Sequence, residues 1–319
     1  MTMSKLAKIC NVSVSTVSKA FMDAEDISKE TKELIFKTAK DEGCFGKFYK
    51  GKYQKKIIAV ICPELQGGYY MNIVEKLKNL IEKDNGICLI SACDFNAKKQ
   101  EEIIEYYASF LRVDGIIVLS LSTKLKKGYE TPIVSLFSSK DEGVDCVKTD
   151  MAYAIGEVVK LLYEKNHRKI AFIGEDLTVP KERNFEKAIK GYKDCDYMSV
   201  RSKKRFEEAG IEGIKELLGS GFEFTAVVSG YDLIALGAMK ELKNRGILVP
   251  EDVSVVGIDN ISVSGYAATS LTTIDTTTDD ITVIAYELLS KKIKNRYFHA
   301  KQNIIIKPRV IVRESIAER

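Results

Sequence analysis

The chain has 319 residues, of which 45% are hydrophobic and 29% charged, as is typical of a soluble globular protein of about two domains. No apolar run approaches the ~18–20 residues that a membrane helix needs, and the amino-terminal segment lacks an apolar signal region, so we expect neither a membrane protein nor a secreted one. The seven cysteines form no CxxC pair and there are only two histidines, which predicts buried thiols in a reducing cytoplasm and argues against a zinc site or a His-based catalytic triad.

The positive charge is concentrated at the amino-terminal end. Residues 1–56 hold 12 lysines, no arginine and 7 acidic residues, a net charge of +5, whereas the remainder of the chain has a net charge of −1. A basic end on a nearly neutral body predicts a polyanionic partner. A solvated charged surface is the alternative, and charge alone does not separate the two.

Three short helices are expected within the first 45 residues. Thr2, Ser13 and Ser28 each precede helically spaced apolar residues and can act as N-caps. The segment NVSVSTVSKAF (11–21) alternates apolar and polar residues as a strand does, but no partner strand lies nearby, so we interpret it as a turn and a helix start. The apolar residues expected to face inward include Leu6, Ile9, Val17, Ala20, Phe21, Leu34 and Ile35.

Two short helices joined by a tight turn and followed by a third form a helix-turn-helix pattern. The second helix would present its solvent-facing amino-terminal residues to base edges in the major groove, and these are Val14, Ser15 and Lys19. The hydroxyl groups expected to bond phosphates belong to Ser13, Thr16, Ser18, Ser28 and Thr31. Ser13 and Ser28 can equally be caps and nothing more.

A basic, glycine-containing stretch, GCFGKFYKGKYQKK, occupies residues 43–56. It predicts a headpiece at residues 1–46 and a hinge linker at 47–56. We expect phosphate contacts from three lysines of this linker, Lys50, Lys52 and Lys55.

From residue 57 onward, short β-branched runs alternate with longer amphipathic stretches. Strands are expected at 57–62, 87–91, 115–119, 133–137, 169–173, 226–229, 253–258 and 303–307. Helices are expected near 69–84, 98–111, 152–165, 183–192, 204–218, 233–245 and 280–294. This alternation predicts an α/β core over residues 57–319, built of two parallel sheets flanked by helices.

Six segments, in order along the chain, carry a recognisable pattern. They are TMSKLAKICNVSVSTVSKAF (2–21), ISKETKELIFKTAKDEG (27–43), NHRKIAFIG (166–174), YDLIALGAMKELKNRGILVPEDVSVVGIDN (231–260), LTTI (271–274) and IKPRVIVRES (306–315). Together they resemble the lactose-repressor (LacI/GalR) family of bacterial transcription regulators. The resemblance implies a helical headpiece followed by a periplasmic-binding-protein-like core, in which two subdomains are joined by crossovers near residues 150, 275 and 300.

The resemblance also implies partners. A homodimer would read a near-palindromic operator in double-stranded DNA, and a small-molecule effector, such as a sugar or a related metabolite, would bind between the core subdomains. Carried over to this sequence, the resemblance implies DNA contacts from nine residues of the first three helices and their caps. They are Met3, Ser13, Val14, Ser15, Thr16, Ser18, Lys19, Ser28 and Thr31. No cofactor and no metal are expected, and the chain is not expected to be an enzyme.

Two departures concern the DNA-binding end. Met22 stands where the family usually has Asn, and the linker lacks the leucine that wedges into the minor groove. Glycines at 46 and 51 disfavour a hinge helix in the absence of DNA. Either Phe48, Tyr49 or Tyr53 takes the wedge role, or the linker is a flexible basic tether.

The effector cleft departs from the family pattern as well. Tyr69 and Tyr70 match an aromatic pair that can stack on a ligand, Asp259 matches a ligand-binding acid, and Lys181 or Arg183 falls near a ligand-binding arginine. Three positions carry unusual residues, namely Phe137, Tyr231 and Thr278. Asp150 and Asp232 suit helix caps or ligand contacts. Such a cleft would suit a less hydroxylated or aromatic ligand.

The sequence therefore predicts a cytoplasmic DNA-binding regulator, most simply a repressor, whose operator affinity depends on an effector. A regulator without an effector, acting through partner proteins or its own abundance, is one alternative. A solute-binding protein for import would share the core but would carry a signal peptide and no basic end. An enzyme would need a reactive constellation, and the acidic clusters at 251–252 and 275–280 look like helix caps and turns.

Overall fold

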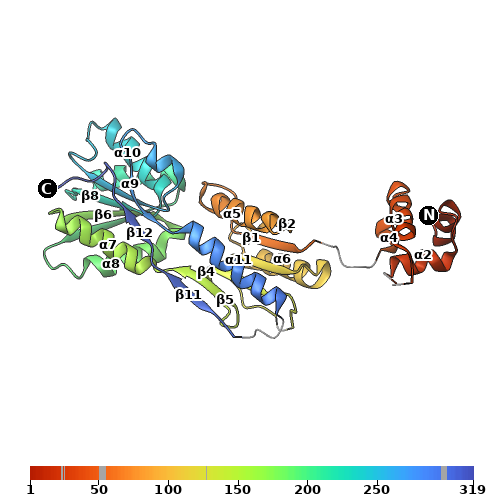
Figure 1. The fold of residues 1–319 in the computed structure, drawn as a ribbon. Coiled ribbons are helices and arrows are strands. Elements are labelled where there is room, and N and C mark those ends of the chain that lie inside the picture. The colour runs from red at the N-terminus through yellow and green to blue at the C-terminus, as the bar shows by residue number, and fades with distance from the viewer. Residues whose placement is uncertain (23, 25, 50–54, 127, 296–299) are drawn as a thin grey trace. The chain divides into compact units, whose positions relative to one another are not determined.

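The computed structural model describes residues 1–22, 24, 26–49, 55–126, 128–295 and 300–319. The chain forms two compact units, Met1–Lys56 and Ile57–Arg319, which are called the headpiece and the core below (Figure 1). Among the described residues, no helix combines the length and the apolar character needed to cross a membrane.

The described headpiece is helical throughout. Its helices are α1 (Met3–Ile9), α2 (Val14–Phe21), α3 (Lys29–Asp41) and the short α4 (Phe45–Phe48). The hydroxyl groups of Thr2, Ser13 and Ser28 each accept a hydrogen bond from the backbone N–H three residues later, so the three predicted caps are confirmed. The alternating segment at 11–21 is a turn and a helix, because the Ser13 hydroxyl accepts a backbone N–H that would otherwise lack a partner at the helix start.

The headpiece has its own small hydrophobic core. Leu6, Val17 and Ile35 are fully buried in it, as predicted. The prediction was wrong for Ile9 and Leu34, whose side chains are each 48% exposed. Successive residues of a helix point about 100° apart, so a neighbour of a buried position can face solvent even when it is apolar.

Helix α4 closes this core with aromatic rings. The Phe21 ring lies 5.3 Å from that of Phe36, 5.9 Å from Phe45 and 5.7 Å from Phe48, measured between centroids. Tyr49 stacks on Phe45 at 4.8 Å. The predicted headpiece limit at residue 46 therefore falls inside a helix that packs on the headpiece, because its aromatic side chains complete the apolar interior.

Two of the three wedge candidates belong to this cluster. Phe48 and Tyr49 are partly buried against the headpiece core, so they would have to leave it to enter DNA. The third candidate, Tyr53, lies outside the described residues, as do Lys50 and Lys52. The expectation about a hinge helix beyond α4 likewise falls on residues 50–54, outside the described part.

The core is built on two sheets, each of six strands within the described residues. The first sheet has the order β11-β5-β4-β3-β1-β2, and all of its pairings are parallel. Its strands are β1 (Ile57–Cys62), β2 (Ile87–Ala92), β3 (Gly115–Leu121), β4 (Ile133–Ser139), β5 (Asp145–Thr149) and β11 (Asn303–Ile306).

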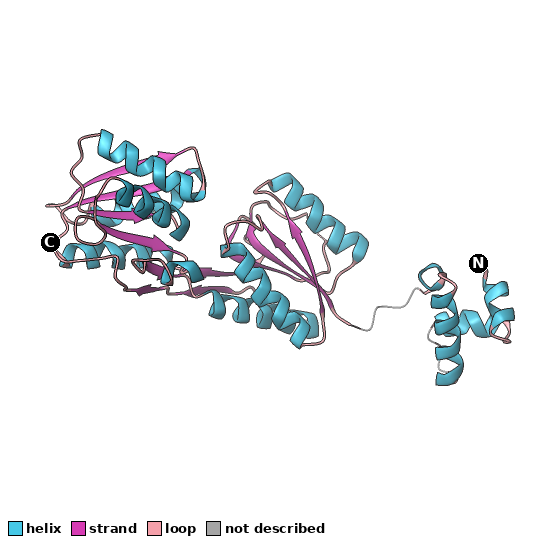
Figure 2. Ribbon diagram, turned by 90° about the horizontal axis from the view of Figure 1, so that it is seen from above, coloured by secondary structure: helices cyan, strands magenta, loops and turns pink. Residues whose placement is uncertain are grey.

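The second sheet has the order β12-β10-β9-β8-β6-β7 and is parallel except for the β10–β12 pair. Its strands are β6 (Lys169–Glu175), β7 (Asp196–Ser202), β8 (Ala226–Ser229), β9 (Ser254–Ile258), β10 (Thr272–Asp275) and β12 (Arg309–Ile311). The two predicted parallel sheets are thus confirmed, and each lies between layers of helices (Figure 2).

Helices cover both faces of each sheet. On the first sheet, α5 (Tyr69–Lys83) and α11 (Thr278–Lys294) pack on one face, and α6 (Ala97–Glu105) with the π-helical turn η1 (Tyr106–Leu111) on the other. On the second sheet, α7 (Met151–Glu164) and α8 (Val179–Ile189) pack on one face, and α9 (Phe206–Gly219) and α10 (Asp232–Asn244) on the other. Two short 3₁₀ turns are η2 (Asp176–Thr178) and η3 (Ser262–Gly265).

The chain passes between the two subdomains three times. It leaves the first sheet after β5, returns after β10 so that α11 packs on the first sheet, and crosses again between β11 and β12. These passages lie near residues 150, 276 and 307, in the short segments between the elements just named. The third lies after residue 306 and not near 300, as the sequence had predicted, because β11 still pairs with β5 in the first sheet.

Candidate functional site

The first candidate site is the exposed amino-terminal end of α2. Ser13 Oγ accepts the backbone N–H of Thr16 at 3.0 Å and lies 2.8 Å from the Thr16 hydroxyl. Capping fixes the start of the helix, and the next two residues, Val14 and Ser15, project into solvent, with Val14 44% exposed. An apolar side chain beside a hydroxyl at a helix start suits contacts with base edges.

The same hydroxyl arrangement recurs at the start of α3. Ser28 Oγ accepts the backbone N–H of Thr31 at 3.2 Å and lies 3.0 Å from the Thr31 hydroxyl. Both serines are therefore caps. A capped helix start also points its remaining backbone N–H groups outward, which favours an anion such as a DNA phosphate.

The other predicted DNA contacts have varied surroundings. Lys19 forms an ion pair with Asp26, a partner that the sequence analysis did not foresee, and this contact lowers the pKa of Asp26. A phosphate would therefore compete with Asp26 for Lys19. Met3 and Ser18 are partly buried, and Lys55 is exposed.

The second candidate site is a cavity of about 410 Å³ between the two core subdomains. It lies at the carboxyl ends of parallel strands, the edge at which α/β proteins commonly bind ligands. Six aromatic side chains line it: Tyr69, Tyr70, Phe95, Phe137, Phe206 and Tyr231. Most of the wall is thus apolar, with charged groups at a few points.

Seven of the eight predicted effector residues line this cavity. They are Tyr69, Tyr70, Phe137, Lys181, Tyr231, Asp232 and Asp259. Arg183 does not line it and is exposed, because α8 turns Lys181 and Asn184, three residues apart, toward the cavity. Thr278 is also outside the cavity lining, and its hydroxyl accepts a hydrogen bond from Lys76 Nζ at 2.7 Å.

Backbone strain is concentrated in the cavity wall. Five non-glycine residues of the lining have positive φ angles: Phe95 (55°), Ser120 (65°), Phe137 (63°), Phe206 (57°) and Asp259 (114°). Each such conformation costs about 1–3 kcal/mol and persists only where the surroundings impose it. Strain of this kind gathers at binding sites, which supports the cavity as a functional site.

Asp259 and Lys181 form a polar pair inside the cavity. Lys181 Nζ lies 3.5 Å from Asp259 Oδ1 and donates a hydrogen bond to the Gly230 carbonyl at 2.8 Å. Burial raises the pKa of Asp259 to about 6, and the ammonium group of Lys181 opposes that rise. The pair offers a ligand one acceptor and one donor side by side.

Asp232 is held by the protein itself. It is fully buried, and its carboxylate accepts hydrogen bonds from the Thr273 hydroxyl at 2.5 Å and from the Ile261 backbone N–H at 2.9 Å. The capping interpretation is wrong for Asp232, because α10 has Tyr231 as its N-cap and no side-chain cap bond. Asp150 does cap α7 by accepting the Tyr153 N–H at 3.0 Å.

These buried carboxyl groups predict a pH dependence. Burial, with a contribution from Asp259, raises the pKa of Asp232 to about 7. The folded core then binds protons that the unfolded chain has already released between about pH 4 and pH 7, so its stability falls as pH rises, by ~1.4 kcal/mol per unit for each proton. His167 opposes this trend below about pH 6.5, because burial lowers its pKa to about 4 and only the unfolded chain binds its proton there. Two carboxyl groups outweigh one imidazole, so we expect a higher unfolding temperature at pH 5 than at pH 8, measured by calorimetry.

The matched variant for this measurement is Asp232→Asn. It should flatten the pH dependence and keep the fold, since its amide oxygen can accept the Ile261 N–H bond while its amide nitrogen donates to the Thr273 hydroxyl. Exposed Glu208→Gln serves as the charge control and should leave the slope unchanged. An identical slope in the wild type and Asp232→Asn would contradict this account.

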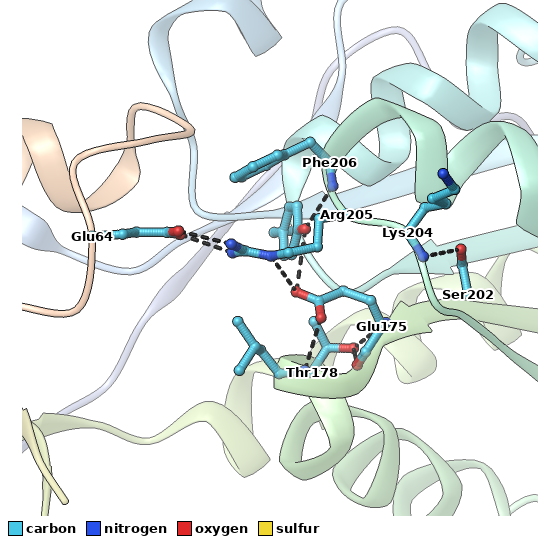
Figure 3. Close-up of polar contacts among 9 residues, drawn as sticks. Glu64, Glu175, Thr178, Ser202, Lys204, Arg205 and Phe206 are labelled. Carbon is cyan, nitrogen blue, oxygen red and sulfur yellow. Dashed lines mark hydrogen bonds and ion pairs between the residues drawn. The ribbon is translucent and has the colours of Figure 1, made fainter. Parts of the chain in front are cut away.

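Three charged residues at the cavity were not predicted from the sequence: Glu64, Glu175 and Arg205. Glu64 follows β1, Glu175 ends β6, and Arg205 precedes α9 (Figure 3). Their only signal in the sequence was a charge at the end of an apolar strand or at a helix start. The Tyr231 hydroxyl joins the group, since it accepts the Phe206 N–H at 2.9 Å and lies 3.3 Å from Glu175 Oε1.

The described residues contain no cluster of three or more potential metal ligands. All seven cysteines are free, five of them buried and two partly buried, in agreement with their predicted role as core residues. His167 is fully buried, with its ring nitrogens bonded to the Thr225 hydroxyl and the Ala317 carbonyl, and burial lowers its pKa to about 4. It is a structural residue of the core.

Several known proteins are similar to this chain in sequence or in fold. The family described as "periplasmic binding protein-like domain" matches residues 159–316. The transcriptional repressor PurR of Salmonella paratyphi B is 29% identical over 342 aligned positions, which cover 99% of this chain and 97% of that protein.

Two crystal structures extend the likeness to the fold. A lac repressor dimer bound to operator and the anti-inducer ONPF has a TM-score of 0.77 at 19% identity and covers 99% of both chains. A LacI family regulator from Enterococcus faecium with bound ribose has a TM-score of 0.72 at 23% identity and covers 83% of this chain and all of that one. The names are those of transcriptional regulators, which agrees with the expectation that the chain is not an enzyme. The headpiece, the two-sheet core and the full-length match to PurR together make this chain similar, in sequence and in fold, to transcriptional regulators of the LacI family.

Proposed function

We propose that the protein represses transcription by binding a near-palindromic operator as a cytoplasmic homodimer, with α2 of each headpiece in the major groove. The observation that carries this proposal is the exposed start of α2, where Val14 and Ser15 project beside a capped helix end. Val14 would contact a thymine methyl and Ser15 a base edge, while the neighbouring hydroxyls would hold phosphates.

A solved structure of similar fold supports the proposed dimer. The lac repressor relative was crystallised as a dimer on its operator. Two headpieces related by a two-fold axis would read two half-sites about one helical turn, ~34 Å, apart. Lys55, exposed just before β1, and the linker lysines would add phosphate contacts that carry no sequence preference.

The core cavity is proposed to bind a small-molecule effector, such as a sugar or a related metabolite. The Enterococcus faecium relative holds ribose, and this cavity offers the Lys181–Asp259 pair for a hydroxyl group. Rings such as Tyr69 and Phe137, with centroids 5.8 Å apart, would pack on an apolar or flat face of the ligand. Ligand-dependent closure of the cleft would alter headpiece spacing and so operator affinity, with a coupling of about 1–3 kcal/mol.

Selection of bound DNA from a random pool tests the DNA-binding proposal, with two variants read out on the selected site. Val14→Ala should lose preference at one position of each half-site, worth about 1–3 kcal/mol, while other positions are kept. Lys55→Ala should weaken all sequences alike and reduce the salt slope by about one per subunit. If Val14→Ala instead lost affinity equally for all sequences, the proposed placement of α2 in the major groove would be contradicted.

A further inference from the structure

Arg205 links the two core subdomains across the mouth of the cavity. Its two terminal nitrogens lie 2.8 Å from Glu64 Oε2 and 2.8 Å from Glu64 Oε1, a bidentate pair drawn in Figure 3. Glu64 belongs to the first subdomain, in the segment after β1, and Arg205 belongs to the second, just before α9. A planar two-point contact of this kind is among the strongest that a guanidinium group makes.

Other contacts hold this pair in place from both sides. The Arg205 guanidinium lies over the rings of Phe95, at 5.4 Å, and Phe206, at 4.6 Å. Its Nε lies 3.6 Å from Glu175 Oε1. Phe206 fits against Gly67 so closely that a Cβ atom there would lie 2.5 Å from the ring. Arg205 and Phe206 thus enter a recess that Glu64, Gly67 and Phe95 form on the other subdomain.

The cavity wall has more acidic than basic groups. Its ionisable carboxyl groups are Glu64, Glu175, Asp232 and Asp259, and its cations are Lys181 and Arg205. Both cations already contact a carboxylate, since Lys181 lies beside Asp259 and Arg205 beside Glu64. Among the described residues that line the cavity, every cationic side chain therefore has a carboxylate neighbour.

We propose that Glu64 is a built-in anionic partner of Arg205, which closes the cleft in the absence of ligand and excludes phosphorylated and carboxylated effectors. This inference rests on the proposed role of the cavity as the effector site. An anionic ligand that sought Arg205 would have to displace Glu64, and would leave that carboxylate in a cavity rich in acids. An uncharged ligand can use Lys181, Asp259 and the aromatic wall without breaking the Glu64–Arg205 pair.

Inorganic phosphate is the probe that tests this proposal, on full-length protein and without DNA. Its binding is followed by thermal unfolding and calorimetry against potassium chloride at equal ionic strength. The unfolding transition of the wild-type core, read separately from that of the headpiece, should gain no saturable stabilisation from phosphate beyond that of chloride. Glu64→Gln releases the two terminal nitrogens of Arg205 and leaves only the 3.6 Å contact of its Nε with Glu175. This variant should bind phosphate roughly ten- to a hundredfold more tightly than the wild type, as expected for a newly available charged hydrogen-bonding site.

Three further variants make the result specific. Exposed Glu208→Gln removes the same charge nearby and should behave as the wild type. The double variant Glu64→Gln/Arg205→Gln should lose the gained phosphate binding, whereas Glu64→Ala should show it, which guards against an effect peculiar to glutamine. Saturable stabilisation of the wild-type core by phosphate, no gain in either Glu64 variant, or a gain that survives loss of Arg205 would each overturn the proposal. Because no operator is present, none of these outcomes depends on whether the headpiece binds DNA.

Discussion

Phe21→Ala should unfold the headpiece and abolish operator binding while the core remains folded. Phe21 is only 4% exposed and its ring contacts three other aromatic rings, from α3 and α4. Truncation of a buried phenylalanine costs about 3–5 kcal/mol, and a core this small rarely supplies more than that in total. The headpiece has its own cluster of buried residues, so its loss does not remove contacts from the core sheets.

Calorimetry and circular dichroism of full-length protein would show the effect of Phe21→Ala as a loss of helical signal with the main unfolding transition retained. Operator affinity, measured by fluorescence anisotropy, should fall at least ~100-fold. The neighbouring variant Met22→Ala is the control, because Met22 is 77% exposed and its truncation removes few contacts. Retained operator affinity in Phe21→Ala would show that the aromatic cluster is not needed for the DNA-binding fold.

Operator affinity should also fall steeply with salt. Residues 1–56 carry a net charge of +5, and a dimer would bring two such ends to the DNA. With about six to ten lysine–phosphate contacts in the complex, affinity should drop by about 10³- to 10⁵-fold between ~50 and ~200 mM salt. The cause is counterion release, which depends on the charges neutralised and not on the bases read.

Titrations at four or more salt concentrations give the slope of log affinity against log salt. Val14→Ala should shift the affinity at each concentration and keep the slope, since valine neutralises no phosphate. A wild-type slope near zero would mean that the basic end does not lie on the DNA backbone, whatever α2 contacts.

The headpiece could be predicted in detail because its determinants are local. Each helix start depends on a hydroxyl that bonds an N–H three residues later, as Ser13 does with Thr16. The exceptions, Ile9 and Leu34, depend on which side of a helix meets its neighbours, and this is a property of packing. Helix α4 was missed because a four-residue helix containing a glycine has little signal of its own and is held by aromatic contacts.

In the core, apolar strands such as β1 were predicted, and strands with more polar residues were not. The strands β5, β7, β10 and β12 carry charged or hydroxyl residues and gain their pairing from neighbours distant in sequence. Thr272 and Thr273 of β10 are fully buried, which no hydropathy pattern indicates.

The cavity shows the same contrast. Family resemblance located residues such as Tyr69 and Asp259 one by one, and all but Arg183 of the predicted set line the cavity. The Glu64–Arg205 pair could not be predicted, since its members lie 141 residues apart in sequence and belong to different subdomains. No fixed spacing in the sequence predicts an ion pair that forms across a cleft.

The three passages between the subdomains have a consequence for biosynthesis. The amino-terminal half of the core is not complete when its own first five strands have emerged, because α11 and β11 come from near the end of the chain. Until then, apolar side chains such as Ile117 and Val134 lack the cover that Leu289 and its neighbours on α11 give them. A ribosome that stalled after β10 would therefore release a polypeptide whose first sheet exposes apolar side chains. Such a polypeptide is a substrate for chaperones and proteases.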